Sequence, residues 1–380
     1  MLKNKKIIII ILVILLLIVL GLILYFFVYQ KEKTPIISEK SVSKLTNKKI
    51  KYVKVLQDGR TIRFNDIETE LFKELNLENG AEKTLSNIPL AEDLEVTWSP
   101  NGEKVIIKIS NNRALLGQLG YFLDNEAPDN FITTWVLDFN TSKLQQLSKS
   151  IGGIDWLSDD KIIYYFSDAL DYPESTESFD SSLVEADWNG KNYQKISDLN
   201  TEDFYNAKIV VSPNKHKVII YPEVEGFGDN NFYIYDLDEK SLQKITEDGL
   251  TPSAAWSSKG EHILFYKVDN NGENPILWLA NQNGVEKKNT KLLSPYGLAI
   301  TSPDDKYVYA VVPKNNKIEL NNFGERTGDD LIYEINSGSL DKTIIFDTSN
   351  HEEIDTITEI GLLGEDIFIV SNNNIYRIKI

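Results

Sequence analysis

The stretch that decides the fold is Val96-Thr97-Trp98-Ser99-Pro100-Asn101-Gly102-Glu103-Lys104-Val105-Ile106-Ile107. An apolar run that ends in Trp is followed by a tight turn and then by a β-branched run. Pro presets φ at the first corner of such a turn, and Asn-Gly accepts the positive φ that a tight hairpin demands. β-Branched and aromatic residues favour strands. The stretch therefore predicts two antiparallel strands joined by a tight turn.

The same motif recurs along the chain, in copies that begin at Val55, Val96, Trp156, Val211, Trp256, Thr301 and Leu362. The fifth motif position, counted from Trp98 in the second copy, is occupied by Gly59, Gly102, Asp160, Lys215, Gly260, Asp305 and Asp366, and these residues are spaced by 43, 58, 55, 45, 45 and 61 positions. A unit of about 45 residues, lengthened in some copies by insertions, suits four short strands. The sequence therefore predicts an all-β propeller of four-stranded antiparallel blades. Seven blades is the favoured count, and six is the alternative because the Val55 copy is degenerate.

The two ends of the repeat region complement each other. The last repeat offers three strands, at 357–363, 367–370 and 375–380, and no fourth. Residues 42–47 resemble the outer strands of other repeats and precede the first one. Pairing of this N-terminal strand with the last blade would close the ring and remove its exposed edges. We expect the motif residues Trp98, Trp156 and Trp256 to pack between blades.

An uncharged run of 23 residues, Ile7–Tyr29, precedes the repeats. A helix of this length would span about 34 Å, enough for a bilayer core of about 30 Å. Lys3, Lys5 and Lys6 lie before the run and favour a cytoplasmic N-terminus with the repeats outside. The alternative, a cleaved signal peptide, has a shorter apolar core and a small-residue cleavage site. The expected organisation is a cytoplasmic segment 1–6, a transmembrane signal anchor 7–29, a stalk 30–40 and a propeller 41–380.

The charge of the chain disfavours nucleic acid as a partner. The formal charge is −17, and because the only charges before residue 30 are three lysines, the remainder carries −20. A domain this acidic repels phosphate backbones. The chain has no cysteine, which excludes disulfides and thiolate metal sites.

The Trp-Ser-Pro-Asn-Gly motif resembles the TolB-like or PD40 repeats, the "WD40-like" propellers, over roughly residues 42–380. Proteins of that family are often periplasmic or on the cell surface, and their propellers usually bind other proteins. The resemblance therefore implies a protein-binding propeller outside the cytoplasm.

The sequence contains almost none of the motifs that mark catalytic sites. There is no H-E-x-x-H, G-x-S-x-G, P-loop or dinucleotide fingerprint. Residues 269–273, Asp-Asn-Asn-Gly-Glu, resemble a calcium loop in their oxygen-rich composition but lack the full spacing of an EF-hand. No cofactor is expected apart from a structural calcium in this loop. A plain solvated turn is the preferred interpretation.

Long insertions fall between the second and third strands of four repeats, at 111–130, 168–181, 222–231 and 313–330. In a four-stranded blade these connections all lie on one face, so we expect one insertion-rich face. Aromatic residues and Arg anchor many interfaces. The candidate binding residues in the insertions are Tyr121, Phe122, Asp171, Tyr172, Phe179, Phe227, Phe323 and Arg326.

These patterns predict a membrane-tethered propeller, located outside the cytoplasm in the cell membrane, that binds a protein or polymer. The alternative is a glycan-processing hydrolase or lyase that uses carboxylates in the central channel.

Overall fold

The computed structural model describes residues 36–90, 94–110, 132–148, 151–167, 181–199, 207–222, 232–245, 253–268, 274–321 and 325–380. The predicted transmembrane run 7–29 lies outside these residues. The described residues include no helix with the length and apolarity that a membrane span needs. The first described strand is β1 (Ile36–Ile37), and the compact unit that forms the propeller spans Ser38–Ile380.

Each motif copy forms the turn between the first two strands of a blade, and in four copies a motif serine organises this turn. The Ser99 N–H donates to Lys104 O at 2.9 Å, while Ser99 Oγ accepts from the Lys104 N–H at 3.0 Å. The same pair of contacts recurs at Ser212, Ser257 and Ser302. Gly102, at the fifth motif position, has φ of 74°, a conformation that glycine adopts without strain.

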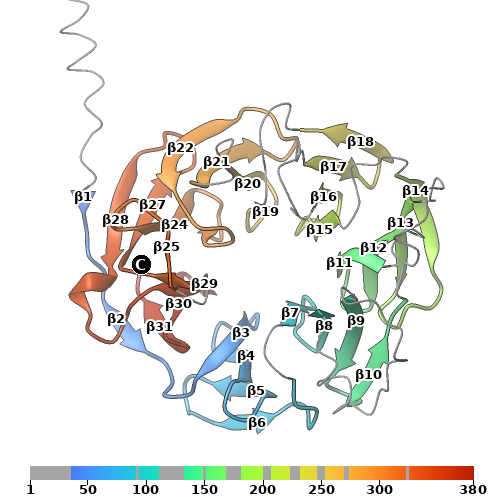
Figure 1. The fold of residues 1–380 in the computed structure, drawn as a ribbon, viewed down its shortest axis with the longest axis horizontal. Coiled ribbons are helices and arrows are strands. Elements are labelled where there is room, and N and C mark those ends of the chain that lie inside the picture. Colours follow the sequence, from blue (N-terminus) through green and yellow to red (C-terminus); the bar gives the residue numbers. More distant parts are fainter. Residues whose placement is uncertain are drawn as a thin grey trace, which may run out of the picture. The chain divides into compact units, whose positions relative to one another are not determined.

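Within the unit Ser38–Ile380, seven four-stranded antiparallel sheets stand around a ring (Figure 1). Blade 1 contains β3 (Ile50–Val55), β4 (Thr61–Asp66), β5 (Leu71–Asn76) and β6 (Glu82–Thr84). Blade 2 contains β7 (Leu94–Trp98), β8 (Lys104–Ser110), β9 (Ile132–Asp138) and β10 (Lys143–Gln146). Blade 3 contains β11 (Ile151–Trp156), β12 (Lys161–Ser167), β13 (Ser181–Asp187) and β14 (Gln194–Asp198).

Blade 4 contains β15 (Ala207–Val211), β16 (Lys217–Pro222), β17 (Tyr233–Asp236) and β18 (Ser241–Lys244). Blade 5 contains β19 (Ala254–Trp256), β20 (His262–Lys267), β21 (Ile276–Asn281) and β22 (Lys288–Leu293). Blade 6 contains β23 (Ala299–Thr301), β24 (Tyr307–Pro313), β27 (Asp330–Asn336) and β28 (Lys342–Asp347). The hairpin β25 (Glu319–Leu320) and β26 (Arg326–Thr327) precedes β27, and the 3-10 helix η3 (Thr348–Asn350) follows β28.

Blade 7 is assembled from both ends of the described chain. Its inner strands are β29 (Ile357–Leu363), β30 (Asp366–Ser371) and β31 (Asn374–Ile378), and its outer strand is β2 (Val42–Lys44). Val42 pairs with Ile378 and Lys44 with Tyr376 in an antiparallel register. The pairing closes the ring within the propeller unit.

The seven-blade count is confirmed, and the six-blade alternative is wrong. The degenerate Val55 copy forms a complete blade because Asp58 replaces the missing serine. The Asp58 carboxylate accepts the Thr61 N–H at 2.9 Å, so the turn keeps a side-chain acceptor for the second strand.

The hydrophobic core lies between blades, in seven clusters that each join two neighbours around the ring. The motif tryptophans take part in this packing and also bind the preceding blade. The indole N–H of Trp98 donates to Tyr52 O, that of Trp156 to Thr97 O and that of Trp256 to Val210 O, each at 2.9 Å. One large side chain thus supplies apolar area and a hydrogen bond at the same junction.

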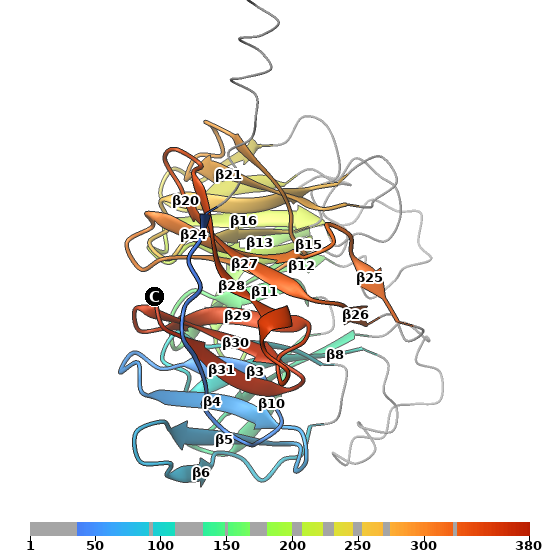
Figure 2. The same ribbon diagram turned by 90° about the vertical axis from the view of Figure 1, so that its left-hand side faces the viewer.

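The two faces of the ring differ in the length of their connections. The turn face carries the connections between strands 1 and 2 and between strands 3 and 4, of which the longest, 188–193 and 282–287, have six residues. The insertion face carries the connections between strands 2 and 3. These are short in blade 1 (67–70) and blade 7 (372–373) but long in blades 2, 3, 4 and 6. Figure 2 shows the hairpin β25–β26 on this side of the ring.

Candidate functional site

The strand ends that flank the four predicted insertions all lie on the insertion face. The register pairs Ser110 with Ile132, Ser167 with Ser181 and Pro313 with Asp330, directly at the bases of three insertions. In blade 4 the last paired residues before the insertion are Ile220 and Tyr233. Seven of the predicted binding residues lie outside the described residues: Tyr121, Phe122, Asp171, Tyr172, Phe179, Phe227 and Phe323. The calcium-like loop 269–273 lies outside them as well.

Arg326 is the one predicted binding residue that the structure describes. Its guanidinium binds both Asp330 carboxylate oxygens, at 3.0 and 2.7 Å, and donates to Ile357 O at 2.7 Å. Asp330 in turn accepts the Ile357 N–H at 2.7 Å. Burial raises the pKa of Asp330 despite the adjacent guanidinium. These contacts join blade 6 to blade 7, and only 14% of the Arg326 side chain is exposed.

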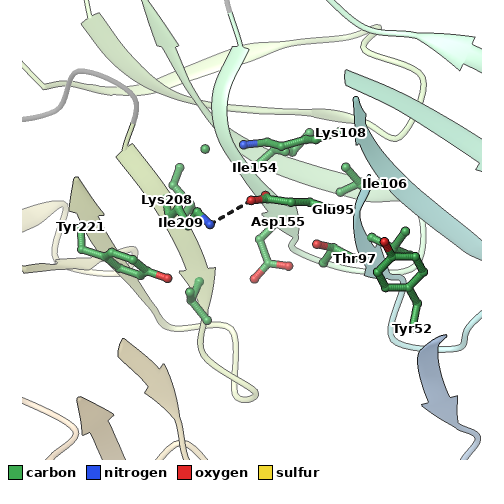
Figure 3. Close-up of a pocket in the computed structure, with 13 residues that line it drawn as sticks. Tyr52, Glu95, Thr97, Ile106, Lys108, Ile154, Asp155, Lys208, Ile209 and Tyr221 are labelled. Atoms are coloured by element: carbon green, nitrogen blue, oxygen red, sulfur yellow. Dashed lines mark hydrogen bonds and ion pairs between the residues drawn. The ribbon is translucent and has the colours of Figure 1, made fainter. Parts of the chain in front are cut away.

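A cavity of about 470 Å³ lies in the wall of the central channel, along blades 1 to 4 (Figure 3). Its lining comes from the inner strands and their neighbours: Tyr52 of β3, Glu95–Thr97 of β7, Ile106 and Lys108 of β8, Gly153–Asp155 of β11, Lys208–Val210 of β15 and Tyr221 of β16. Lys108 lies two residues before the end of β8, and Tyr221 is next to the last residue of β16. The rim of the cavity therefore lies at the bases of the insertions in blades 2 and 4.

The inner strand β11 is irregular where it lines the cavity. A register shift between Ile151 and Ile154 bends this inner strand. Within the bend, a Cβ on Gly153 would lie 2.1 Å from Ala207 O of β15, so only glycine allows the two inner strands to approach this closely.

An ion pair crosses the cavity above the bend. Lys208 Nζ of blade 4 lies 3.0 Å from Glu95 Oε1 of blade 2, and the inner strand of blade 3 lies between these two strands. Figure 3 shows this pair with Asp155 below it and with Tyr221 and Tyr52 on opposite sides of the cavity. Glu95 is 54% exposed and Lys208 is 33% exposed, so the pair contributes little stability and is open to a ligand.

Asp155 lines the cavity and also accepts hydrogen bonds from the backbone of two inner strands. Its Oδ1 accepts the N–H of Trp156 at 2.7 Å, and its Oδ2 accepts the N–H of Val211 in blade 4 at 2.8 Å. Burial raises the pKa of Asp155 to about 6, although both hydrogen bonds and the nearby Lys54 ammonium act in the opposite direction. Burial also lowers the pKa of Lys54, an effect that Asp159 and Asp155 oppose.

Glu359 makes an equivalent contact at the junction of blades 7 and 1. Its two oxygens accept the N–H groups of Tyr52 and Val53, at 2.9 and 3.2 Å. Burial raises the pKa of this carboxyl group too. Channel carboxylates therefore satisfy backbone N–H groups of the inner strand in the following blade, which ordinary sheet pairing leaves unbonded.

The cavity is lined by side chains of several chemical types. It presents two tyrosines, ammonium groups, one exposed carboxylate and one carboxyl group whose proton exchanges near pH 6. In the described part of the chain, no three His, Cys, Asp or Glu side chains gather as metal ligands would. Such a lining suits a ligand with hydroxyl, amide or carboxylate groups.

No motif of the sequence indicates this cavity. The available signals were the glycine pair Gly152-Gly153, one residue removed from Asp155, and the charges at Glu95 and Lys208, which interrupt otherwise apolar inner strands. None of them indicated which blades would meet.

No protein-family model and no curated protein matches the sequence. Solved structures do match its fold. An oligogalacturonate lyase in complex with manganese is 11% identical with a TM-score of 0.57, over 91% of this chain and 96% of that one. The oligogalacturonate lyase of Vibrio parahaemolyticus is 12% identical with a TM-score of 0.57, over 91% and 96%.

The β-propeller domain of the trilobed protease from Pyrococcus furiosus is 14% identical with a TM-score of 0.51, over 87% of this chain and 95% of that domain. TolB from Acinetobacter baumannii is 12% identical with a TM-score of 0.41, over 87% and 78%. The three structures with TM-scores above 0.5 show a shared propeller fold, and at these identities they show the fold alone.

Proposed function

We propose that this chain is a membrane-tethered propeller outside the cytoplasm that binds a protein or polymeric ligand through its insertion face. The observation that carries the proposal is the position of the cavity. Its rim lies at the bases of two insertions, and the strand ends that flank all four insertions share that face. Binding sites in propellers need such a concave centre surrounded by variable connections.

The tether rests on the apolar run 7–29, and the orientation rests on the lysines that precede it. Membrane fractionation of cells that produce the full chain tests the tether. Protease treatment of intact cells tests the orientation: digestion of the propeller from outside supports the proposal, and protection overturns it.

Ligand capture tests the binding face directly. The propeller, residues 36–380, would be crosslinked to extracts of the cell envelope, beside variants in which single insertions are replaced by the four-residue connection 67–70 of blade 1. We expect trimming at blades 2 and 4, which border the cavity, to abolish capture. A matched change on the turn face, at residues 188–193 of blade 3, serves as the control. Equal capture by all variants would refute the insertion face as the binding surface.

A second candidate function is a glycan-processing hydrolase or lyase that acts in the channel. The observation that favours it is Asp155, a cavity carboxyl group whose pKa of about 6 suits proton transfer near neutral pH. Against it stands the use of both Asp155 oxygens as backbone acceptors.

Incubation with a panel of acidic and neutral oligosaccharides, followed by product analysis, separates the two functions. Turnover that disappears in Asp155→Asn and persists in Asp304→Asn, an exposed turn residue, would establish the enzyme. Unchanged oligosaccharides that nevertheless bind would support the binding module.

A further inference from the structure

A run of lysines stands out against the acidity of the propeller. Residues 40–54 contain six lysines and neither Asp nor Glu, although the chain as a whole carries −17. Four of these lysines, Lys40, Lys44, Lys48 and Lys49, lie between 38 and 49, a segment that we term the strap. The other two are engaged elsewhere: Lys51 lies over the Tyr52 ring, and Lys54 is half-buried.

The strap is fixed along the rim of the ring. The N–H groups of Ser38 and Lys40 donate to Ile344 and Ile345 carbonyls of blade 6, at 2.8 and 2.9 Å. The strap then forms β2 on the outer edge of blade 7. Figure 2 shows it running down the side of the ring that faces the viewer, across the ends of these two blades.

The strap lysines keep their charge exposed. Lys44 and Lys49 are exposed, Lys40 and Lys48 are partly exposed, and Lys379, bonded through its N–H to Ser41 O, adds another exposed ammonium beside them. Within the described residues, Lys40, Lys44 and Lys49 form no ion pair, and those of Lys48 with Asp66 and Glu82 are long, at 3.9 and 3.8 Å.

The one acidic residue of the strap, Glu39, and the two carboxylates that Lys48 approaches, Asp66 and Glu82, are held by other partners. Glu39 accepts from Asn350 Nδ2 at 2.9 Å and lies 3.4 Å from His351 Nε2. Asp66 lies 2.7 Å from the Lys73 ammonium, and Glu82 lies 3.0 Å from it. The strap is therefore a local positive edge on a negative domain.

We infer that the strap is a docking surface for the anionic head groups of the membrane in which the chain is anchored. The inference rests on the proposed tether. Ten residues, 30–39, separate the apolar run from Lys40, which limits their separation to about 35 Å. Lysines held this close to an anionic lipid surface are attracted to it over about a Debye length. Docking would fix which edge of the propeller faces the membrane, while the rest of the acidic domain is repelled.

Vesicle binding by the propeller without its anchor tests the inference. Residues 38–380 form a compact unit that contains all seven core clusters and its own closing strand, so the fragment 36–380 retains the fold. The test variant carries Lys40→Gln, Lys44→Gln, Lys48→Gln and Lys49→Gln. The control carries Lys83→Gln, Lys143→Gln, Lys240→Gln and Lys244→Gln, which removes the same charge from exposed lysines on other blades.

The wild-type fragment should cosediment with phosphatidylglycerol vesicles and not with phosphatidylcholine vesicles, and the binding should weaken as salt rises. We expect a loss of about fivefold per strap lysine, so the test variant should bind at least about a hundredfold more weakly. The control should lose much less. Thermal melts of both variants establish that each is folded.

Equal losses in test and control variants would overturn the inference, because overall charge would then explain binding. Indifference to lipid charge would also overturn it. Stronger capture by soluble polyphosphate than by vesicles would assign the strap to a polymer instead. The fragment lacks the apolar run, so these results are independent of the fractionation experiment that tests the tether.

Discussion

Replacement of Asp155 by Asn should change how the stability of the propeller depends on pH. Burial raises the pKa of this group from 3.8 to about 6 in the folded protein. A carboxyl group whose folded pKa lies above its unfolded pKa favours folding when it is protonated. Its contribution is therefore complete below pH 3.8 and is lost as the pH rises through 6. At its limit the raised pKa changes the free energy of unfolding by about 3 kcal/mol, and about 2 kcal/mol of this change occurs between pH 7 and pH 4.

The assay is urea denaturation of the fragment 36–380 and its Asp155→Asn variant at several pH values. Loss of one backbone acceptor gives the variant a constant cost of about 1–3 kcal/mol. The informative quantity is the change with pH: the stability of the wild type relative to the variant should increase by about 2 kcal/mol from pH 7 to pH 4. Asp304→Asn is the control. Its effect on the change of stability with pH should have the opposite sign, because Lys306 and Ser302 lower the pKa of that carboxyl group. A relative stability that is constant, or that falls toward pH 4, would refute burial as the dominant effect at Asp155.

Three further changes test the junctions of the ring. Gly153→Ala should destabilise the fragment by at least about 2 kcal/mol in urea denaturation, because its Cβ would meet Ala207 O at 2.1 Å, whereas Gly338→Ala on the surface should change little. Trp256→Phe should cost about 1–2 kcal/mol by the same measurement, since it removes the hydrogen bond to Val210 O; an unchanged midpoint would contradict that contact. Deletion of residues 36–47 should lower the thermal midpoint and expose blade 7 to proteolysis, because the strand pairing of β2 and the partly buried side chains of Val42 and Leu45 contribute about 2–4 kcal/mol; a midpoint equal to that of 36–380 would show that the ring closes without β2.

The blade pattern was predictable because each copy of the motif solves the same local problem. A hairpin needs an acceptor for the second strand and a residue that tolerates positive φ, and Ser99 and Gly102 supply both within five residues. The degenerate first copy meets the same need with Asp58, which explains why its sequence pattern was weak while its blade is complete.

The cavity was not predictable because its contacts are not local. Lys208 meets Glu95 from 113 positions away, and Glu359 binds Tyr52 from 307 positions away. Lys208, Glu95 and Glu359 each look like an ordinary charged residue in a strand. Only the cyclic order of blades brings them together, and the fold of a single repeat contains no information about which partner lies across the channel.

Blade 7 combines an N-terminal strand with three C-terminal strands, and this arrangement affects how the chain folds during synthesis. A ribosome delivers β2 first, but its partner β31 emerges only after the other six blades have been made. Until then the edge strand has no neighbour in its own blade, and late pairing between distant segments folds slowly and exposes nascent chains to association. Lys40 before β2, Lys44 within it, and Lys48 and Lys49 after it protect that unpaired edge, since positive charge on an edge strand opposes pairing with another copy. The same lysines would thus have two roles. They would oppose association with other chains during synthesis, and they would contact the membrane after the ring has closed.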